Sequence, residues 1–571
     1  MKLVRTRSCL RSPLHLLGYA TLLAAPALMS GLASAQNQVW VKQIGTNKLD
    51  EGNAVARGPS GGVYLGGHTQ GALGGTNAGS NDAWVGRWDS AGNQLWIRQF
   101  GLATSESTAD ALPGPSDGVF VCGGTAGNLG GTWAGGTDAW VALYDSDGSQ
   151  VWITQFGTAG NEGAGELAED SAGGFFVSGS TNSSLGGPNA GGSDVWVARY
   201  DASGGQLWIR QFGSAATDDM IANSPDAAGG VYLCGRTLGD LGGPAQAGQD
   251  AWLAHYDGAG NQLWVRHLGS LGDDQGWAVE PDGAGGVYFG GYTDNVLGAS
   301  SAGGFDAWVA RYDSAGNQQW IRQFGTNLTD RVRASAPDPA GGIFVCGETE
   351  GSLGGPYLGL GDMWVARFDS LGNQVWITQF GTDTFEFNGC AAADGAGGMI
   401  LGGYTLGDLG GPYAGGFGDA WFARYEGSCG QSIATYCTAS STSIPGCQAA
   451  INSTGAPSLS APNAFSILSG AVPGATPGIC FFGTNGQASI PFGTLGGKIC
   501  VQPPLTRSQA KLGGGTSGVC NGQFVFTLQD LLQVNAGITA GTKVCAEIWA
   551  RDPANADGSM LSNGLQFIAC P

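Results

Sequence analysis

The stretch Asp306-Ala-Trp-Val-Ala-Arg-Tyr-Asp313 alternates in polarity and leads through Ser-Ala-Gly-Asn into Gln318-Gln-Trp-Ile-Arg-Gln-Phe324. Two alternating runs around a short, glycine-containing turn predict a β-hairpin. Its second tryptophan recurs every 56 residues, at Trp40, Trp96, Trp152, Trp208, Trp264, Trp320 and Trp376. Its first recurs likewise, slipping by one residue in the last copy, at Trp84, Trp140, Trp196, Trp252, Trp308, Trp364 and Trp421. Seven copies at a fixed period predict a repeat architecture.

Each copy within residues 36–426 contains four strand candidates and no helical periodicity. In the third copy the candidates are 150–157, 165–169, 174–179 and 194–200. Seven units of four short strands predict an all-β fold, a seven-bladed β-propeller. A right-handed β-solenoid is the alternative, but its coils are usually shorter, and four antiparallel strands with tight turns fit a radial blade better.

The phase of the repeat predicts that the ring closes. The array begins with the second half of the hairpin, at 38–44, and ends with the first half, at 419–425. An open array would leave two unpaired strand edges, which favour aggregation. We therefore expect 38–44 to be the outer strand of the last blade, strapping the first blade to the last.

These residues resemble the SBBP-type β-propeller repeat of secreted and surface bacterial proteins. The resemblance rests on Gly285-Gly-Val-Tyr-Phe-Gly-Gly-Tyr-Thr293, on Leu297-Gly298 and on the hairpin that starts at Asp306. It covers the seven copies, and it implies a propeller fold. Such families mostly have no assigned activity, so it implies little about function.

Residues 1–35 are predicted to be a secretory signal peptide. Four basic residues precede an apolar stretch at 14–32, and Ala33-Ser-Ala35 supplies small residues for cleavage. An N-terminal membrane anchor is the alternative, which the small residues disfavour. No other run approaches the ~18 apolar residues of a membrane span. We expect a secreted protein, extracellular or at the cell surface, with the periplasm as a further possibility, and no membrane span after signal cleavage.

The charge and composition exclude several classes. The formal net charge is −21, and it becomes −25 once the signal is removed. So acidic a chain repels phosphate backbones, which argues against nucleic acid, and it collects cations. Glycine accounts for 105 of 571 residues, yet 42% are hydrophobic and 18 are tryptophan, which excludes a disordered chain.

Residues 427–571 form a predicted Cys-rich β domain, since the 56-residue period stops there. Short apolar runs favour a small β-sandwich, and 528–534 is either one helical turn or a strand. Eight cysteines predict up to four disulfides in an oxidising compartment, with their pairing open. They are Cys429, Cys437, Cys447, Cys480, Cys500, Cys520, Cys545 and Cys570.

Four segments of this tail resemble a recurrent C-terminal module of large secreted proteins from planctomycete-type bacteria. They start at Tyr436, Cys500, Trp549 and Leu561. The resemblance implies export and a domain boundary near Gly427, and no role beyond these.

An acidic ring is the strongest candidate site. Seven carboxylates spaced by 56 enter the predicted innermost strands, so a closed ring would circle them around one face of the channel; they are Asp50, Glu106, Glu162, Asp218, Asp274, Asp330 and Glu386. Hard oxygen ligands suit Ca²⁺, the one cofactor the sequence suggests. The alternative, which we favour, is that each side chain caps its own loop by accepting backbone N–H bonds.

Other repeated residues have structural interpretations. A second acidic ring consists of one aspartate two residues before the first tryptophan of each hairpin, and it is expected to fix the turn before that strand. It comprises Asp82, Asp138, Asp194, Asp250, Asp306, Asp362 and Asp419. The fourteen repeated tryptophans are predicted to form core between blades. Trp88, Trp133 and Trp277 break the pattern and are better candidates for exposure.

Catalysis finds little support. The three histidines beyond the signal lie in unrelated registers, and the near-uniform loops argue against an elaborated pocket. We expect a non-enzymatic binding or interaction protein that presents a repeated surface to an extracellular protein, a polysaccharide or a divalent cation. A secreted carbohydrate-active hydrolase or lyase using the acidic ring is one alternative, and a purely structural envelope protein is another.

Overall fold

A computed structural model of the chain describes residues 38–425, apart from 299, 340 and 396, and residues 434–569 with short gaps. These gaps are 438, 441, 446, 455–456, 458–461, 464, 493, 495–496, 518, 536 and 539–541. The predicted signal lies outside the described residues. Within the described ranges, no helix is both long enough and apolar enough to cross a membrane.

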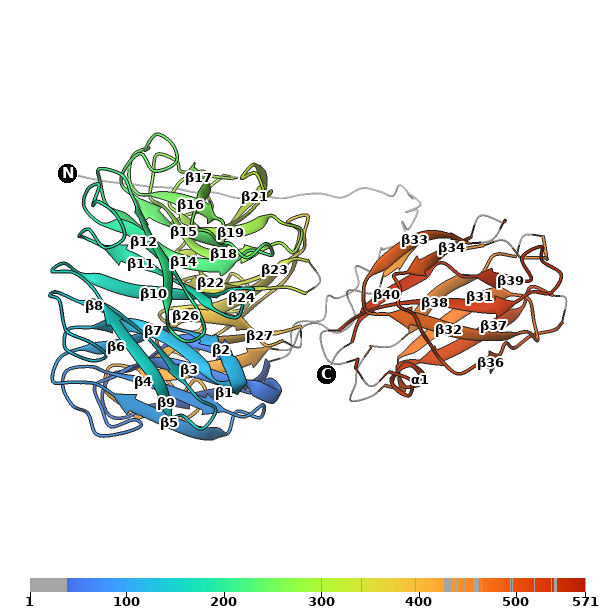
Figure 1. Ribbon diagram of the computed structural model, residues 1–571, viewed down its shortest axis with the longest axis horizontal. Helices are drawn as coiled ribbons and strands as arrows, with labels where there is room; N and C mark the ends of the chain where they lie inside the picture. Colours follow the sequence, from blue (N-terminus) through green and yellow to red (C-terminus); the bar gives the residue numbers. More distant parts are fainter. Residues whose placement is uncertain are drawn as a thin grey trace, which may run out of the picture. The chain divides into compact units, whose positions relative to one another are not determined.

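Seven four-stranded antiparallel sheets form a seven-bladed β-propeller (Figure 1). The innermost strands of blades one to seven are β2 (Asp50–Arg57), β6 (Glu106–Pro113), β10 (Glu162–Glu169), β14 (Asp218–Pro225), β18 (Asp274–Pro281), β22 (Asp330–Pro337) and β26 (Glu386–Ala393). The second strands are β3 (Val63–Thr69), β7 (Val119–Thr125), β11 (Phe175–Thr181), β15 (Val231–Thr237), β19 (Val287–Thr293), β23 (Ile343–Thr349) and β27 (Met399–Thr405).

The remaining two strands of each blade are the predicted hairpin. The third strands are β4 (Asp82–Trp88), β8 (Asp138–Tyr144), β12 (Asp194–Tyr200), β16 (Asp250–Tyr256), β20 (Asp306–Tyr312), β24 (Asp362–Phe368) and β28 (Asp419–Tyr425). The outer strands are β5 (Gln94–Phe100), β9 (Gln150–Phe156), β13 (Gln206–Phe212), β17 (Gln262–Leu268), β21 (Gln318–Phe324), β25 (Gln374–Phe380) and β1 (Gln38–Ile44). Short 3₁₀ turns, Pro59–Gly61 and Pro115–Asp117, join the first two strands of blades one and two.

The predicted closure of the ring is confirmed. Strand β1 pairs antiparallel with β28, with Gln43 opposite Trp421. The Gln43 side chain donates to the Asp419 carboxylate at 2.9 Å, as the other outer-strand glutamines do in their own blades. Trp40 donates to the Ser90 carbonyl of blade one at 3.0 Å. The strap therefore joins the last blade to the first, and innermost strands β26 and β2 contact each other like any other neighbouring pair.

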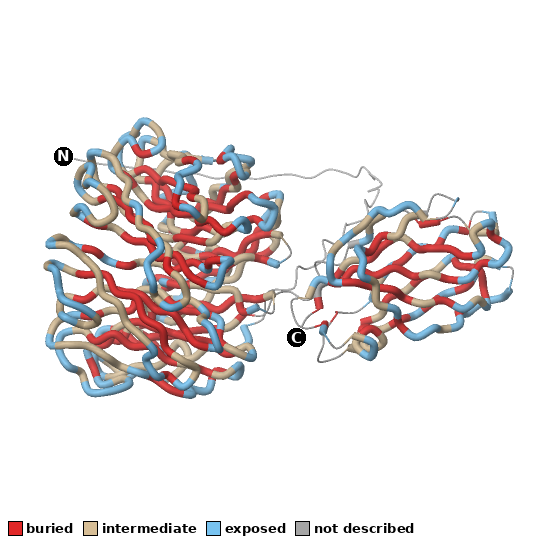
Figure 2. The backbone as a smooth tube through the Cα atoms, viewed as in Figure 1, coloured by how far each residue is buried: buried red, intermediate tan, exposed pale blue. Residues whose placement is uncertain are grey.

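Figure 2 shows that much of the propeller's strands is buried, and the buried apolar clusters combine side chains of neighbouring blades, so the core lies between the blades. All seven tryptophans of the third strands are fully buried, which confirms the prediction for this set. Those of the outer strands pack on the next blade: Trp96 donates to the Ser146 carbonyl at 2.9 Å, beside Gly148, whose φ is 79°. A side chain at Gly148 would collide with the indole.

Two of the three non-repeating tryptophans differ from the prediction of exposure. Trp88 is 1% exposed, because its ring packs 4.9 Å from Phe422 of blade seven and 6.5 Å from Trp84. Trp277 is half-buried in the central channel. Trp133 is 45% exposed, as predicted.

The two larger sheets of residues 434–569 enclose an apolar core, in agreement with the predicted β-sandwich, and a smaller apolar cluster lies around Phe481 and Val501. The larger sheet contains β29 (Ala434–Tyr436), β40 (Gly564–Ile568), β38 (Lys543–Arg551), β32 (Pro477–Gly483), β35 (Thr506–Arg507), β36 (Lys511–Leu512) and β39 (Ser559–Leu561). The smaller contains β30 (Ala450–Thr454), β31 (Ser466–Val472) and β37 (Gly522–Thr527). A hairpin of β33 (Gln487–Phe492) and β34 (Gly497–Val501) and the short helix α1 (Leu528–Leu532) complete it.

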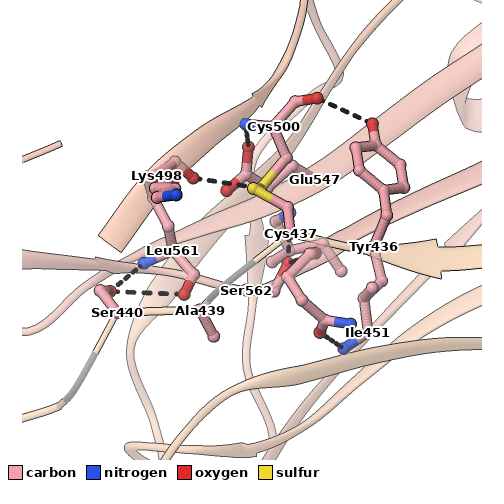
Figure 3. Close-up of a disulfide and its surroundings, with 12 residues drawn as sticks. Tyr436, Cys437, Ala439, Ser440, Ile451, Lys498, Cys500, Glu547, Leu561 and Ser562 are labelled. Carbon is pink, nitrogen blue, oxygen red and sulfur yellow. Dashed lines mark hydrogen bonds between the residues drawn. A yellow bond between two sulfur atoms is a disulfide. The ribbon is translucent and has the colours of Figure 1, made fainter. Parts of the chain in front are cut away.

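Among the described residues, two disulfides join segments of this sandwich. They are Cys437–Cys500 (Figure 3) and Cys447–Cys520. Beside the first, Tyr436 donates to the Cys500 carbonyl, and the Cys500 amide donates to the Glu547 carboxylate, both at 2.8 Å. Of the other disulfide candidates, Cys480 and Cys545 are buried free thiols, and Cys429 and Cys570 lie outside the described residues. Disulfides are typical of proteins in oxidising, non-cytoplasmic compartments.

Candidate functional site in the central channel

The seven carboxylates of the acidic ring are each the first residue of an innermost strand, rather than part of the loop before it. All are fully buried. Glu106 is representative: it accepts bonds from the Leu102 amide at 2.7 Å and from the Thr104 and Thr125 hydroxyls at 2.6 and 3.0 Å. A threonine at the end of the second strand bonds the ring carboxylate of its own blade in five further blades, namely Thr69, Thr181, Thr237, Thr349 and Thr405.

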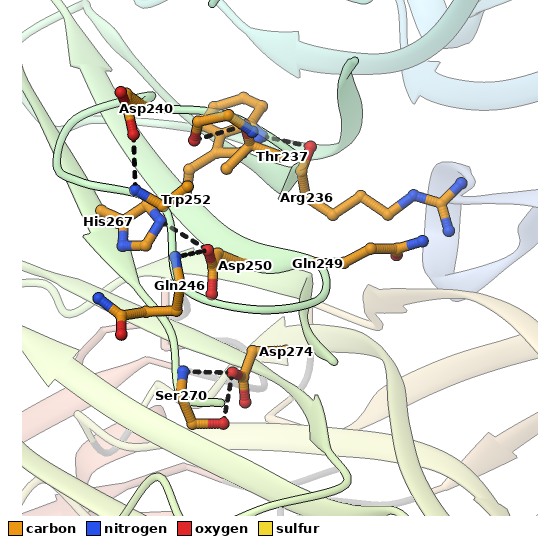
Figure 4. A network of polar contacts seen from close by, with 12 residues as sticks. Arg236, Thr237, Asp240, Gln246, Gln249, Asp250, Trp252, His267, Ser270 and Asp274 are labelled. Carbon is orange, nitrogen blue, oxygen red and sulfur yellow. Dashed lines mark hydrogen bonds and ion pairs between the residues drawn. The ribbon is translucent and has the colours of Figure 1, made fainter. Parts of the chain in front are cut away.

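The second ring fixes the loop before each third strand. Asp82 accepts bonds from the Ala78 amide and the Gln99 side chain, both at 2.9 Å. In blade four, where histidine replaces this glutamine, the Asp250 carboxylate accepts from the Gln246 amide at 2.7 Å and lies 3.1 Å from His267 Nε2 (Figure 4). This is the turn-fixing role that the sequence predicts.

The two rings meet where neighbouring blades join. A Cβ added to Gly101 would lie 2.5 Å from Asp82 Oδ1 and 3.0 Å from Glu106 Oε2, so a glycine is required between them. Burial raises the pKa of Asp274, and the charge of Asp250 adds to the effect. Across the described residues, no group of three or more His, Cys, Asp or Glu side chains is arranged to hold a metal ion. The geometry therefore supports a hydrogen-bonding role for these carboxylates.

A cavity of about 390 Å³ occupies the central channel, and the innermost strands of all seven blades line it. Every innermost strand contains a β-bulge, located between Ala164 and Glu166 in blade three. A bulge inserts one extra residue, so two consecutive side chains reach one face of the strand. Trp277 and Ala278 of blade five accordingly both line the cavity.

Three acidic residues on these strands form what we call the channel acid cluster: Asp110, Glu166 and Glu280. The carboxyl groups of Asp110 and Glu166 hydrogen-bond to each other across blades two and three. The Leu167 amide donates to Asp110 at 2.8 Å. Glu280 of blade five accepts bonds from the hydroxyls of Ser224 at 3.1 Å and Ser335 at 3.4 Å, which belong to the blades on either side.

Burial dominates the protonation of the channel acid cluster. It raises the pKa of Asp110 to about 7 and that of Glu280 to about 8. It raises the pKa of Glu166 well above its ordinary value, and the adjacent Asp110 carboxylate raises it further. Like charges in one site and low polarity both disfavour the ionised form. None of the ion pairs among the described residues involves these three acids.

The channel has a different character at blades five and six. The guanidinium of Arg333 lies 4.3 Å from the Trp277 ring, which stacks on Tyr292. Arg333 and Arg331 both pair with Glu348, at 2.6 and 2.8 Å. Glu348 offsets only one of the two arginine charges, and neither arginine forms an ion pair with the channel acid cluster.

The uniform loops of the sequence do not reveal the asymmetry of the channel. The loops are uniform, but the channel-lining strand positions are not. At the register of Asp110 and Glu166, the other five blades have Ala54, Ala222, Ala278, Ala334 and Cys390. Reading each copy of the repeat at a fixed offset from its ring carboxylate would have identified this difference.

The fold and its channel define the protein as a seven-bladed β-propeller with an asymmetric polar channel and a disulfide-linked β-sandwich. No family model matches the chain. It is 27% identical over 237 residues to the regulatory protein FlaEY of Caulobacter vibrioides, a match that covers 38% of this chain. The aligned part spans about a quarter of that relative, 24% of its length.

The solved structures that match the chain have low sequence identities and TM-scores below 0.5. A protein of unknown function from Dyadobacter fermentans is 11% identical, with 68% of this chain and 98% of that chain covered and a TM-score of 0.36. Sqt1 from Chaetomium thermophilum is 12% identical, with 69% and 91% covered and a TM-score of 0.36. The Hadza microbial sialidase Hz136 is 9% identical, with 62% and 75% covered and a TM-score of 0.35.

Proposed function

We propose that the protein is an exported, non-enzymatic binding protein whose central channel is its ligand site. The observation that carries this proposal is the asymmetry of the channel within an otherwise sevenfold chain. Asp110 and Glu166 stand where four other blades have alanine, so folding of a blade does not require an acid there. These acids are half-buried and have no ion-pair partner, which costs stability, and groups retained at such a cost concentrate at functional sites.

Binding is favoured over carbohydrate hydrolysis or lysis on geometric grounds. Glycosidases separate their two carboxyl groups by about 5 to 9.5 Å so that a sugar or a water fits between them. The carboxyl groups of Asp110 and Glu166 instead form a direct hydrogen bond with each other, which leaves no room for a sugar or a water between them. The carboxylates of the acidic ring, which the alternative would use, are buried and already accept hydrogen bonds within their blades.

Export is supported by the predicted signal peptide and by the two disulfides. The SBBP-type repeat and the planctomycete-type C-terminal module remain proposals, as do the boundaries 36–426 and 427–571. A calcium ion at the acidic ring also stays a prediction, which calorimetric titration of the full chain with calcium tests. A purely structural envelope protein is the remaining alternative, and it would show no saturable ligand binding.

Blocking the channel tests the proposed function. Gly389 of β26 is exposed, lines the cavity and occupies the register at which blade five accommodates Trp277, so Gly389→Trp fills the channel without a new backbone demand. Full-length protein and this variant are screened by thermal shift and glycan array against saccharides, amines and divalent cations. We expect at least one saturable ligand that Gly389→Trp no longer binds. Ligands that bind both proteins equally would place the site outside the channel.

A further inference from the structure

We propose that the channel acid cluster binds the protonated amino group of a small organic ligand that enters the central channel. This inference rests on the proposed function and specifies the chemistry of the ligand. It depends on three features of the cavity: its unpaired acids, an additional unsatisfied acceptor, and its size.

The first feature is that none of the three acids forms an ion pair. The charged side chains that share the cavity are Arg57, Glu169 and Arg333. Arg333 pairs with Glu348, and Arg57 is exposed at the end of β2 and pairs with none of the three acids. The neighbouring titratable groups are the thiols of Cys122, Cys234 and Cys390, whose pKa values burial raises well above the ordinary value, so they stay neutral. A ligand that brings a positive charge would therefore be the counter-ion of this cluster.

The second feature is an orphaned acceptor atom on a residue that lines the same cavity. Asn223 is 9% exposed and donates from Nδ2 to the Glu166 carbonyl at 3.1 Å and to the Ser178 hydroxyl at 2.6 Å. Its Oδ1 has no hydrogen-bond partner among the described residues. A buried acceptor without a donor is costly, and it indicates a missing hydrogen-bond donor. Carboxylates and an amide oxygen accept hydrogen bonds from N–H groups, which an ammonium supplies and a quaternary amine does not.

The third feature is size. A cavity of about 390 Å³ is far larger than a bare ion, and it falls within the range of small-molecule sites. The channel acids approach it from blades two, three and five, so the charged group of a ligand would lie among them and its apolar part against the alanines of the other blades. An alkyl amine fits this arrangement better than a divalent cation.

Binding of such a ligand is coupled to proton release. Below pH 7 the acids hold their protons, and an ammonium must displace them to form an ion pair. Each proton released makes the association constant rise up to tenfold per pH unit below the pKa of its acid. We therefore expect affinity to increase at least tenfold between pH 6 and pH 8, while an alkyl amine stays protonated throughout.

Isothermal titration calorimetry of the full chain tests the inference, with 1,5-diaminopentane as probe and 1,5-pentanediol as its uncharged counterpart. We expect saturable binding of the diamine and no binding of the diol. The heat of diamine binding should differ between phosphate and Tris, because the released protons are taken up by buffers with different enthalpies of ionisation. Glu280→Gln and Asp110→Asn should each weaken binding at least tenfold. Asp383→Asn, which removes an exposed loop charge, is the matched control and should leave binding unchanged.

The outcomes separate this inference from the proposed function. Equal binding of diol and diamine, affinity independent of pH, or equal losses in Asp383→Asn and Glu280→Gln would each overturn the amine assignment. Binding of calcium or tetramethylammonium in preference to the diamine would also overturn it. A neutral ligand that Gly389→Trp blocks and Glu280→Gln leaves unaffected would refute the amine assignment and keep the channel as the site. Absence of any channel-dependent ligand would refute the proposed function itself.

Discussion

The replacement Glu280→Gln should stabilise the propeller at alkaline pH. Burial raises the pKa of Glu280 from 4.5 to about 8. Between these two pH values the folded state therefore holds a proton on Glu280 that the unfolded state has released. The stability from this group is full below pH 4.5 and declines as pH rises towards 8. At 1.36 kcal/mol per pKa unit the loss approaches roughly 5 kcal/mol, and partial solvent exposure reduces it to about 2–4 kcal/mol. Glutamine keeps the shape of the side chain and removes this loss.

The measurement is guanidinium unfolding at pH 5, 7 and 9, followed by tryptophan fluorescence. Trp549 is the single tryptophan beyond residue 425, so the signal reports mainly the propeller. The free energy of unfolding of the wild type should fall with pH more steeply than that of the variant, and the two should differ least at pH 5. Glu169→Gln, at an exposed end of β10, is the control and should follow the wild type. Parallel pH profiles for Glu280→Gln and wild type would refute the reasoning.

Three further predictions concern the fold. Deleting residues 38–44 removes the strap and leaves β28 unpaired, so we expect a lower melting temperature for the whole propeller than in a chain that starts at residue 38; unchanged melting would contradict closure. Gly101→Ala should cost about 1–3 kcal/mol in chemical unfolding because its Cβ meets two carboxylates, whereas Gly163→Ala, with nothing within 4 Å, should change stability by less than about 1 kcal/mol; equal effects would refute the junction geometry. Replacing Cys437 and Cys500 by serine opens a loop spanning 63 residues and should lower sandwich stability by roughly 2–4 kcal/mol, seen as faster hydrogen exchange in β34; unchanged exchange would show that the disulfide adds no stability.

The fold was predictable because the same 56-residue pattern recurs seven times and because the array starts and ends within the hairpin. One hairpin is divided between the ends of the array, with its second half at 38–44 and its first half at 419–425. This division alone predicts the pairing of β1 with β28. Trp88 was predicted wrongly, although it occupies the register of Tyr144 and the other aromatic residues that end the third strands. Comparison of that register would have placed it in the core.

The alternation of side chains along a regular strand does not predict which residues line the channel. A regular strand would place Glu162, Ala164 and Glu166 on one face, so Glu166 would share the environment of the ring carboxylate. The bulge after Ala164 shifts the register by one residue and directs Glu166 to the channel. Bulges depend on pairing with the neighbouring strand, which the amino-acid order of one strand does not reveal.

The strap has a consequence for the order in which the ring is assembled during synthesis. Strand β1 is made first, yet its partner residues lie up to 387 positions later, as the Tyr425–Gln38 bond shows. Contacts so distant in sequence form slowly, because the intervening chain must be ordered first. Any ribosome pause, truncation or cleavage before β28 therefore leaves an open ring with an exposed edge at each end. The propeller thus becomes complete only when its last strand has been made, and until then the chain carries unpaired edges that favour aggregation.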